Sequence, residues 1–391
     1  MRSQTGYSSW FRISDFGFRI LTLAGFAVSA LPTPTPACSL CANLQQVPTF
    51  RQEAAQPNAR MILYGTFKSD KNVVNGTPFH ITVVLRSDKF IEGKTTVVVP
   101  KYIPADDEKP FLLFADVFKD GIDAYRGVPI KTAEGVEYVK AVLKLDPKNT
   151  TENLQFFFNY LDCADKEVAH DAFMEFAKAT DVEIGAVAKK LPADKLRRWL
   201  KDADTPPERV GLYSFLLGAC GSKDDAEQLA AMLHKDDDRT TKAFDGILAG
   251  YINLRPKEGW ELALSTLKDD KKSFEVRLSV VRTMRFFYLA HPKESKEVVL
   301  QGMEIMLVRS DLADVAIEDM RRLKIFDLTP EVLGLYGTKG YEGQLMRETI
   351  VRYALACKDD AAAQKFLALR RQNEGELVRD VEDALRFEKP K

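Results

Sequence analysis

Two cysteines near the start of the chain come closest to a chemical motif. Cys38-Ser39-Leu40-Cys41 has the spacing of a thiol–disulfide redox pair. Such a pair sits after a strand, at the start of a helix, whereas here a proline-rich stretch (Pro32–Pro36) precedes it. A zinc site would need two more ligands, and the nearest histidine is His80. We therefore expect Cys38 and Cys41 to form a local disulfide or to carry a lipid, with thiol–disulfide or metal handling as the alternative function.

The remainder of the sequence offers no catalytic set. Its histidines are far apart and show no metal-ligand spacing, so we expect surface or cap positions for all four: His80, His170, His234 and His291. Gly337–Gly343 is glycine-rich, but it lacks the Gly-Lys-Ser/Thr of a phosphate-binding loop and is expected to join two helices. We predict a protein that is not an enzyme and that uses no cofactor.

One aromatic segment is a candidate for partner binding. Arg285-Phe286-Phe287-Tyr288 combines the residue types that dominate binding energy at interfaces, and core packing is the alternative for it. Lys195–Trp199 and Met320–Lys324 are basic with apolar interleaving, as in amphipathic helices that face solvent. Lys and Arg number 56 against 57 Asp and Glu, which lacks the positive surplus that nucleic-acid binding needs. The expected partner is a protein or peptide.

The N-terminal segment predicts export. The run Ile20–Leu31 carries no charge, follows basic residues and is shorter than the roughly 20 residues that span a bilayer. Residues 1–37 are therefore interpreted as a signal peptide, cleaved after Ala30 or after Ala37, with a buried N-terminal helix as the alternative. Cleavage after Ala37 would leave Cys38 first, where a lipid could anchor the protein to a membrane. The expected location is periplasmic, in the cell envelope or extracellular.

Residues 38–148 are predicted to form a β-rich domain. Turn dipeptides of the Asn-Gly and Asp-Gly kind separate short β-type runs. The runs are Met61–Phe67, Phe79–Leu85, Thr95–Val99 and Phe111–Phe118; the turns are Asn75-Gly76, Glu92-Gly93, Asp120-Gly121 and Arg126-Gly127; and a helix is expected over Glu134–Leu145. Strands this close together predict a small antiparallel barrel or sandwich.

This layout resembles the netrin-like module, an OB-type barrel found in metalloprotease inhibitors of the TIMP kind and in complement proteins. The shared features are the initial cysteine pair, the strand Ile62–Phe67, the strand Phe111–Ala115 and the closing helix. In those inhibitors the first cysteine chelates the zinc of the target, so the resemblance implies that role for Cys38 if cleavage leaves it first. The family has Cys-x-Cys with partner cysteines along the barrel; this chain has Cys-x-x-Cys and no others there. A netrin-like metalloprotease inhibitor is a further alternative function.

Residues 151–388 are predicted to form an α-helical repeat solenoid, because the apolar period changes from about 2 to about 3.6. From Arg209 on, successive first helices start roughly 31 to 38 residues apart. The first helices are Asp165–Lys178, Arg209–Cys220, Thr240–Tyr251, Ser273–Leu289, Asp311–Leu323 and Leu345–Cys357. The second helices, each behind a short polar turn, include Ala226–Leu233, Gly259–Leu267, Ser295–Leu307 and Asp360–Arg370, and Glu376–Phe387 is expected to cap the array.

This pattern resembles HEAT or armadillo repeats. Phe274-Glu275-Val276-Arg277-Leu278-Ser279-Val280 is similar to the first helix of that family, with an acidic residue, Val and Arg at its start. The predicted fold class is therefore multidomain α+β, a small antiparallel OB/netrin-like β-barrel followed by a HEAT-like α-solenoid, with an irregular helical bundle as the alternative for the second part. The predicted function is a non-catalytic, exported binding or scaffold protein.

Overall fold

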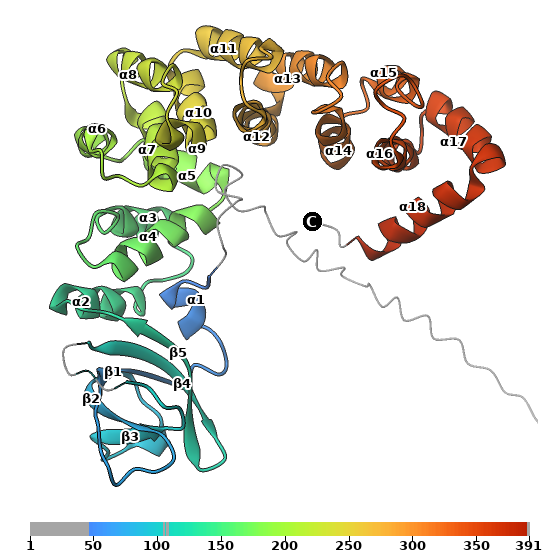
Figure 1. Ribbon diagram of the computed structural model, residues 1–391. Coiled ribbons are helices and arrows are strands. Elements are labelled where there is room, and N and C mark those ends of the chain that lie inside the picture. The colour runs from blue at the N-terminus through green and yellow to red at the C-terminus, as the bar shows by residue number, and fades with distance from the viewer. Residues whose placement is uncertain (1–46, 105, 107–108, 389–391) are drawn as a thin grey trace, which may run out of the picture. The chain divides into compact units, whose positions relative to one another are not determined.

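The structure, a computed structural model, describes residues 47–104, 106 and 109–388 (Figure 1). In this part of the chain one short helix precedes a five-stranded antiparallel sheet, and further helices follow the sheet to Phe387. The predicted α+β class is therefore confirmed. The interpreted signal segment, with Cys38 and Cys41, lies outside the described residues. Within them, no helix is both long and apolar enough to cross a membrane.

The sheet is a curled half-barrel. Its strands are β1 (Met61–Phe67), β2 (Thr77–Arg86), β3 (Thr96–Val99), β4 (Phe111–Phe118) and β5 (Gly121–Pro129). They lie in the order β3-β2-β1-β4-β5, with every neighbouring pair antiparallel. The curl brings β3 toward β5, and Lys101 donates from Nζ to the carbonyl oxygen of Ala124 at 2.8 Å. No ladder joins β3 to β5 among the described strands, so the sheet is open where the sequence predicted a closed barrel.

The two faces of the sheet belong to two separate cores. Side chains alternate along β1, so Met61 and Leu63 point into the curl whereas Ile62 points to the opposite face. The inward side chains form a small core of their own with Phe79 and Val99. The opposite face packs beneath two helices, α1 (Phe50–Ala54) and α2 (Ala133–Val142). The sheet is thereby attached to the helical part through apolar contacts.

The last strand corrects one predicted turn. The turn at Asp120-Gly121 is confirmed and is entered through Lys119, which has a φ of 54°. Arg126-Gly127, in contrast, lies inside β5, opposite Phe114 and Leu113. A Cβ at Gly127 would lie 3.2 Å from Cδ2 of Leu113. This glycine therefore relieves crowding within the ladder and does not turn the chain.

Four further helices follow α2: α3 (Thr150–Phe158), α4 (Lys166–Lys178), α5 (Asp181–Ala188) and α6 (Ala193–Lys201). The prediction of α4 is confirmed, and its N-cap Asp165 accepts a hydrogen bond from the N–H of Glu167 at 3.1 Å. A capping box between Thr180 and Glu183 starts α5. The basic segment Lys195–Trp199 lies on α6, as predicted for an amphipathic helix.

The remaining helices come mostly as pairs joined by short turns. Their bounds are α7 (Pro207–Cys220), α8 (Lys223–Leu233), α9 (Asp238–Lys242), α10 (Phe244–Leu254), α11 (Pro256–Lys268), α12 (Phe274–Ala290), α13 (Pro292–Leu307), α14 (Ala313–Leu323), α15 (Thr329–Gly334), α16 (Gln344–Ala356), α17 (Ala361–Asn373) and α18 (Gly375–Phe387). The predicted helix over Thr240–Tyr251 is split at Ala243 into α9 and α10. The glycine-rich segment Gly337–Gly343 is the expected loop, between α15 and α16.

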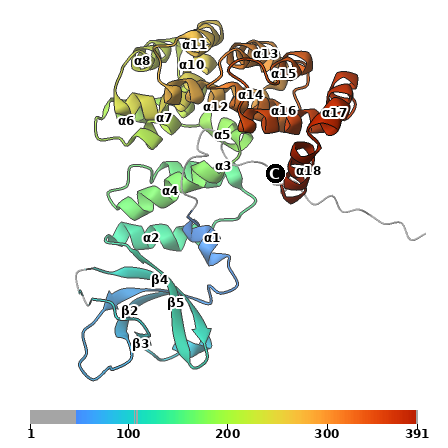
Figure 2. The same ribbon diagram turned by 45° about the vertical axis from the view of Figure 1, so that its right-hand side comes forward.

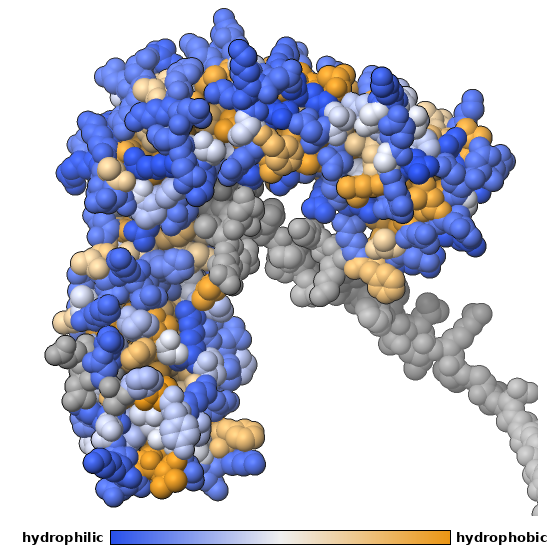
Figure 3. All heavy atoms as spheres, viewed as in Figure 1, coloured by the Kyte–Doolittle hydropathy of each residue, from blue (hydrophilic) through white to orange (hydrophobic). Residues whose placement is uncertain are grey.

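The pairs place their helices in two rows. We call α7, α10, α12, α14 and α16 the first row and α8, α11, α13, α15 and α17 the second row (Figures 1 and 2). Several neighbours within a row touch, namely α7 with α10, α10 with α12, α14 with α16, α11 with α13 and α15 with α17. Hydrophilic residues cover most of the face seen in Figure 3, with hydrophobic residues between them. The arrangement agrees with the predicted alternation of first and second helices.

Two first-row helices, α7 and α10, cross at a distance that only glycine permits. A Cβ at Gly250 of α10 would lie 2.2 Å from the carbonyl oxygen of Ser214 in α7. A Cβ at Gly246 would lie 2.3 Å from the carbonyl oxygen of Gly211. Both contacts are to backbone atoms, which cannot rotate out of the way. The missing side chains therefore fix how closely this pair of helices approaches.

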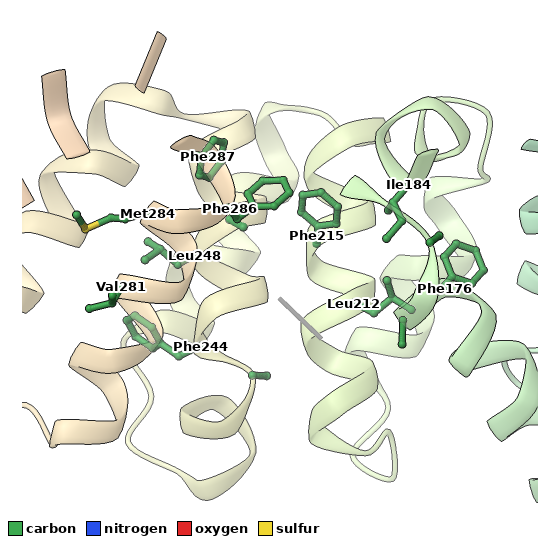
Figure 4. Packing of buried hydrophobic residues seen from close by; sticks show 14 of the residues in the cluster. Phe176, Ile184, Leu212, Phe215, Phe244, Leu248, Val281, Met284, Phe286 and Phe287 are labelled. Carbon is green, nitrogen blue, oxygen red and sulfur yellow. The ribbon is translucent and has the colours of Figure 1, made fainter. Parts of the chain in front are cut away.

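The buried side chains form a continuous core along the helices. One cluster extends from Phe50 in α1, through Ile62 in the sheet, to Val381 in α18. Figure 4 shows part of it, where Phe215 of α7 packs edge to face against Phe286 of α12 with ring centroids 5.0 Å apart. The predicted division between residues 38–148 and 151–388 stays a prediction, and in the described residues the change from strands to helices lies between β5 and α2. Apolar packing nevertheless continues across it.

Candidate functional site

The predicted aromatic anchor lies on α12, and its two phenylalanines belong to the core. Phe286 and Phe287 are only 2% and 5% exposed. Phe286 packs against Phe215 of α7 (Figure 4). Phe287 packs against Trp260 of α11 at 5.2 Å between ring centroids. An exposed aromatic anchor is therefore wrong for these two residues, because α12 is covered by helices of both rows on the side they occupy. The core-packing alternative is correct for them.

The two flanking residues of the segment remain accessible. Tyr288 is half-buried against the core. Arg285 reaches across to α14, where its Nε and Nη2 donate to the carboxylate of Asp319 at 3.2, 2.7 and 2.8 Å. Partner binding by Arg285 and Tyr288 stays a prediction.

The pair between Arg285 and Asp319 places the cation outermost. The Asp319 side chain is 6% exposed, whereas that of Arg285 is 33% exposed. Burial raises the pKa of Asp319, and the charge and hydrogen bonds of Arg285 oppose that rise. The guanidinium thus compensates a buried carboxylate on one side and meets solvent on the other.

Glu318, next to Asp319 on α14, contacts three further guanidinium groups. It accepts hydrogen bonds from Arg321 at 2.9 and 2.7 Å and from Arg322 at 2.6 Å, and Nη1 of Arg352 on α16 lies 3.9 Å from it. Burial on its own would raise the pKa of Glu318, but the hydrogen bonds and charges of Arg321 and Arg322 bring it below its ordinary value. We call the four guanidiniums (Arg285, Arg321, Arg322 and Arg352), gathered around Glu318 and Asp319, the arginine cluster.

A residue from the end of the chain completes this cluster. Arg321 donates from Nη2 to Oε1 of Glu388 at 2.7 Å, a contact between residues 67 positions apart. Glu388 directly follows α18. The cluster therefore already binds one carboxylate, that of the residue directly after α18. Guanidinium groups bind carboxylates and phosphates through paired N–H donors and neither accept nor release protons near neutral pH.

A second polar group lies where α1 meets α4. The carboxylate of Asp171 is buried and accepts two hydrogen bonds, from the N–H of Phe50 at 2.6 Å and from the hydroxyl of Tyr138 at 2.7 Å. Burial raises the pKa of Asp171 to about 7. One turn away, Glu175 pairs with Arg51 of α1 at 2.6 Å. These contacts hold α1 on the helical part.

The histidines and cysteines of the described part show no site. All four histidines are exposed, and His234 and His291 are helix caps, so the prediction of surface or cap positions is confirmed. Cys357 is buried, Cys163 and Cys220 are half-buried, and all three are free thiols. Among the described residues, no three His, Cys, Asp or Glu side chains lie together in a way that could hold a metal ion.

Comparison with known families, with curated proteins and with solved structures finds no match to this chain. The arginine cluster is therefore identified as a candidate site by its geometry alone. Part of its signal is present in the sequence, because Met320–Lys324 is basic and lies on an amphipathic helix, as expected. The convergence of Arg285, Arg352 and Glu388 on that helix is set by tertiary packing.

Proposed function

We propose that this protein is an exported, non-catalytic scaffold that binds a protein or peptide partner on its first row of helices. The observation that carries the proposal is the succession of α12, α14 and α16, whose half-exposed side chains reach from one helix to the next. Arg285 bridges α12 to α14, and Arg352 approaches Glu318 from α16. Large interfaces need several elements held in a fixed relation, and packed helices joined in this way supply them.

The finer identities of the two parts belong to the same proposal. The half-barrel, with α2 after its last strand, is a netrin-like module of the OB type, and the approach of β3 to β5 supports this because OB folds are five-stranded, partly open barrels. The two rows are HEAT-like repeats in a solenoid, which is supported by the succession of helix pairs from α7 to α17.

Export and processing are proposed from the N-terminal sequence. The intact mass and N-terminal sequence of the protein isolated from cells test them together. We expect a chain that begins at Leu31 or at Cys38, with Cys38 and Cys41 either oxidised to each other or with Cys38 lipidated. A protein that retains Met1 and stays in the cytosolic fraction would contradict export.

Binding is tested by immobilising the full chain and passing cell-envelope extract over it. We expect a protein that is retained, that is released by an excess of the same chain in solution, and that is not retained once the immobilised chain is heat-unfolded. Recovery of the same proteins from the folded chain, the unfolded chain and a blank support would contradict the proposal. Mass spectrometry of the retained fraction identifies the partner.

A further inference from the structure

We propose that the arginine cluster binds an acidic segment of a protein partner and that Glu388 is an internal carboxylate which the segment displaces. The inference rests on the proposed function and names the chemistry of its partner. It rests on the balance of charge in the cluster, on which of its groups face solvent, and on the contact that Glu388 already makes.

The charges of the arginine cluster do not balance. Four guanidiniums meet two carboxylates of the helices, Glu318 and Asp319, so the groups joined by these ion pairs carry four positive and two negative charges, a surplus of two. Glu388 supplies one further negative charge from the end of the chain. An unbalanced positive charge remains, and carboxylates are the side chains that neutralise guanidiniums with matching geometry.

Most cations of the arginine cluster are accessible to solvent. The carboxylates of Asp319 and Glu318 are 6% and 20% exposed. Three of the four cations are more exposed than either carboxylate, at 33% for Arg285, 50% for Arg322 and 27% for Arg352, whereas Arg321 is 11% exposed. The approach of Arg352 to Glu318, at 3.9 Å, is too long for a hydrogen bond. Within the described part of the chain no other polar partner is seen for its guanidinium. A partner therefore meets N–H donors that have capacity left.

The contact between Glu388 and the arginine cluster is weak. Glu388 reaches the cluster through Arg321 alone, and the preceding Phe387 is 86% exposed and adds no packing. The Glu388 side chain is 38% exposed, and ion pairs made with a solvated partner are weak. A partner segment with several carboxylates makes more than one such contact at once and so competes well with a single glutamate. Glu388 shows that the cluster binds carboxylates, and while it is bound it limits access to the site.

The test measures the anisotropy of a fluorescein-labelled oligoglutamate mixed with the full chain and its variants. The key variant is R322A/R352A, in which Glu318 keeps Arg321 as its partner and no buried carboxylate is orphaned. Its matched control is K257A/K293A, which removes the same charge from exposed residues of the second row. We expect R322A/R352A to weaken binding by at least about tenfold, since each removed guanidinium would donate charge-assisted hydrogen bonds to the carboxylates of oligoglutamate. The control should bind like the wild type.

A variant with the opposite expectation keeps the test valid if R322A/R352A fails to fold. E388Q changes an exposed side chain and should tighten oligoglutamate binding by about twofold to fivefold, because it removes the internal competitor. Equal weakening in R322A/R352A and in the lysine control would overturn the proposal, as would unchanged binding in E388Q. Displacement of oligoglutamate by an equal concentration of inorganic phosphate would overturn it too, in favour of a phosphate site.

The proposed function can fail separately. If the envelope partner is captured equally well by the wild type and by R322A/R352A, the arginine cluster is not its binding site and the scaffold function stands. If oligoglutamate binds as expected but no envelope protein is retained, the site is real and the scaffold function fails.

Discussion

Two buried aspartates show how local partners decide the behaviour of a carboxylate. Asp319 faces a guanidinium, so its negative charge is matched by a positive one. Asp171 accepts its hydrogen bonds from an amide and a phenol, which are neutral donors. Neutral donors compensate a buried charge less completely than a cation does. Asp171 is therefore the group whose protonation should couple to stability near neutral pH.

The first prediction concerns that coupling. The pKa of Asp171 is raised by burial from an ordinary 3.8 to about 7, against the opposing effects of Tyr138, the N–H of Phe50 and Arg126; Glu175 acts with the burial. A carboxyl with a raised folded-state pKa binds its proton more tightly when folded, so its contribution is complete below about pH 4 and is lost as the pH rises through about 7. We expect Asp171→Asn to remove that loss.

The measurement is the free energy of unfolding in urea between pH 4 and pH 8. The slope in this range should be visibly smaller in Asp171→Asn than in the wild type, whereas Asp123→Asn, a change at an exposed position of β5, should keep the wild-type slope. Identical slopes in wild type and Asp171→Asn would refute the assignment.

The second prediction tests the compensation of Asp319. Arg285→Leu leaves that carboxylate buried without its cation, and we expect a loss of about 2 kcal/mol in the free energy of unfolding, a value reduced because Arg285 is one-third exposed. Adding Asp319→Asn to the same chain should restore part of the loss. A double variant less stable than Arg285→Leu would show that the pair contributes through packing alone.

At the scale of elements, the close crossing of α7 and α10 is the most constrained contact. Helix interiors ordinarily favour alanine over glycine by about 1 kcal/mol. Gly246 and Gly250 nevertheless occupy one face of α10, against the backbone of α7. The cost of glycine is offset by apolar contact between helices that could not otherwise approach so closely.

The third prediction follows from this crossing. Gly250→Ala forces the two backbones apart, so we expect the free energy of unfolding to fall by about 1–3 kcal/mol despite the better helix propensity of alanine. The matched control is Gly185→Ala on α5, where a Cβ would meet no atom within 4 Å. That control should be as stable as the wild type or more stable by up to about 1 kcal/mol. Equal effects of the two changes would contradict the steric argument.

The elements differ in how well the sequence predicts them. Long amphipathic helices such as α12 and α16, and the apolar strand β4, follow from periodicity within a few residues of their observed ends. The sequence does not predict the strand β5, because Arg126-Gly127 resembles a turn. In the structure Gly127 lies within β5, where a side chain would crowd Leu113. The arginine cluster is predicted only in part, through the basic segment Met320–Lys324. Arg285, Arg352 and Glu388 come from three other segments, and their approach to α14 depends on packing between helices.

At the scale of the whole molecule, α1 joins the sheet to the helices. Phe50 contacts Phe114 of β4 and Tyr138 of α2, while its N–H is bound by Asp171 of α4. Three other elements therefore depend on one short helix of five residues. Short helices are unstable alone, so α1 persists through these contacts.

The fourth prediction uses this dependence. Phe50→Ala should lower the free energy of unfolding by about 3–5 kcal/mol, because it opens a cavity shared by sheet and helices. We expect the urea midpoints reported by helical circular dichroism and by hydrogen exchange of the backbone amides of β1 and β4 to fall together. A fall in only one of them would show that the sheet and helices unfold independently.

The hydrogen bond from Phe50 to Asp171 also has a consequence for the order of events in the cell. Its partners are 121 positions apart, so α1 leaves the ribosome or an export channel long before α4 does. The strand partners of β1, by contrast, all emerge within the span of the sheet, and each first-row helix emerges soon after its neighbour. During vectorial synthesis the half-barrel can therefore assemble before its first helix is bound to α4. The N-terminal end of the described chain is synthesised first and is fixed in place only after the helices of the junction have arrived.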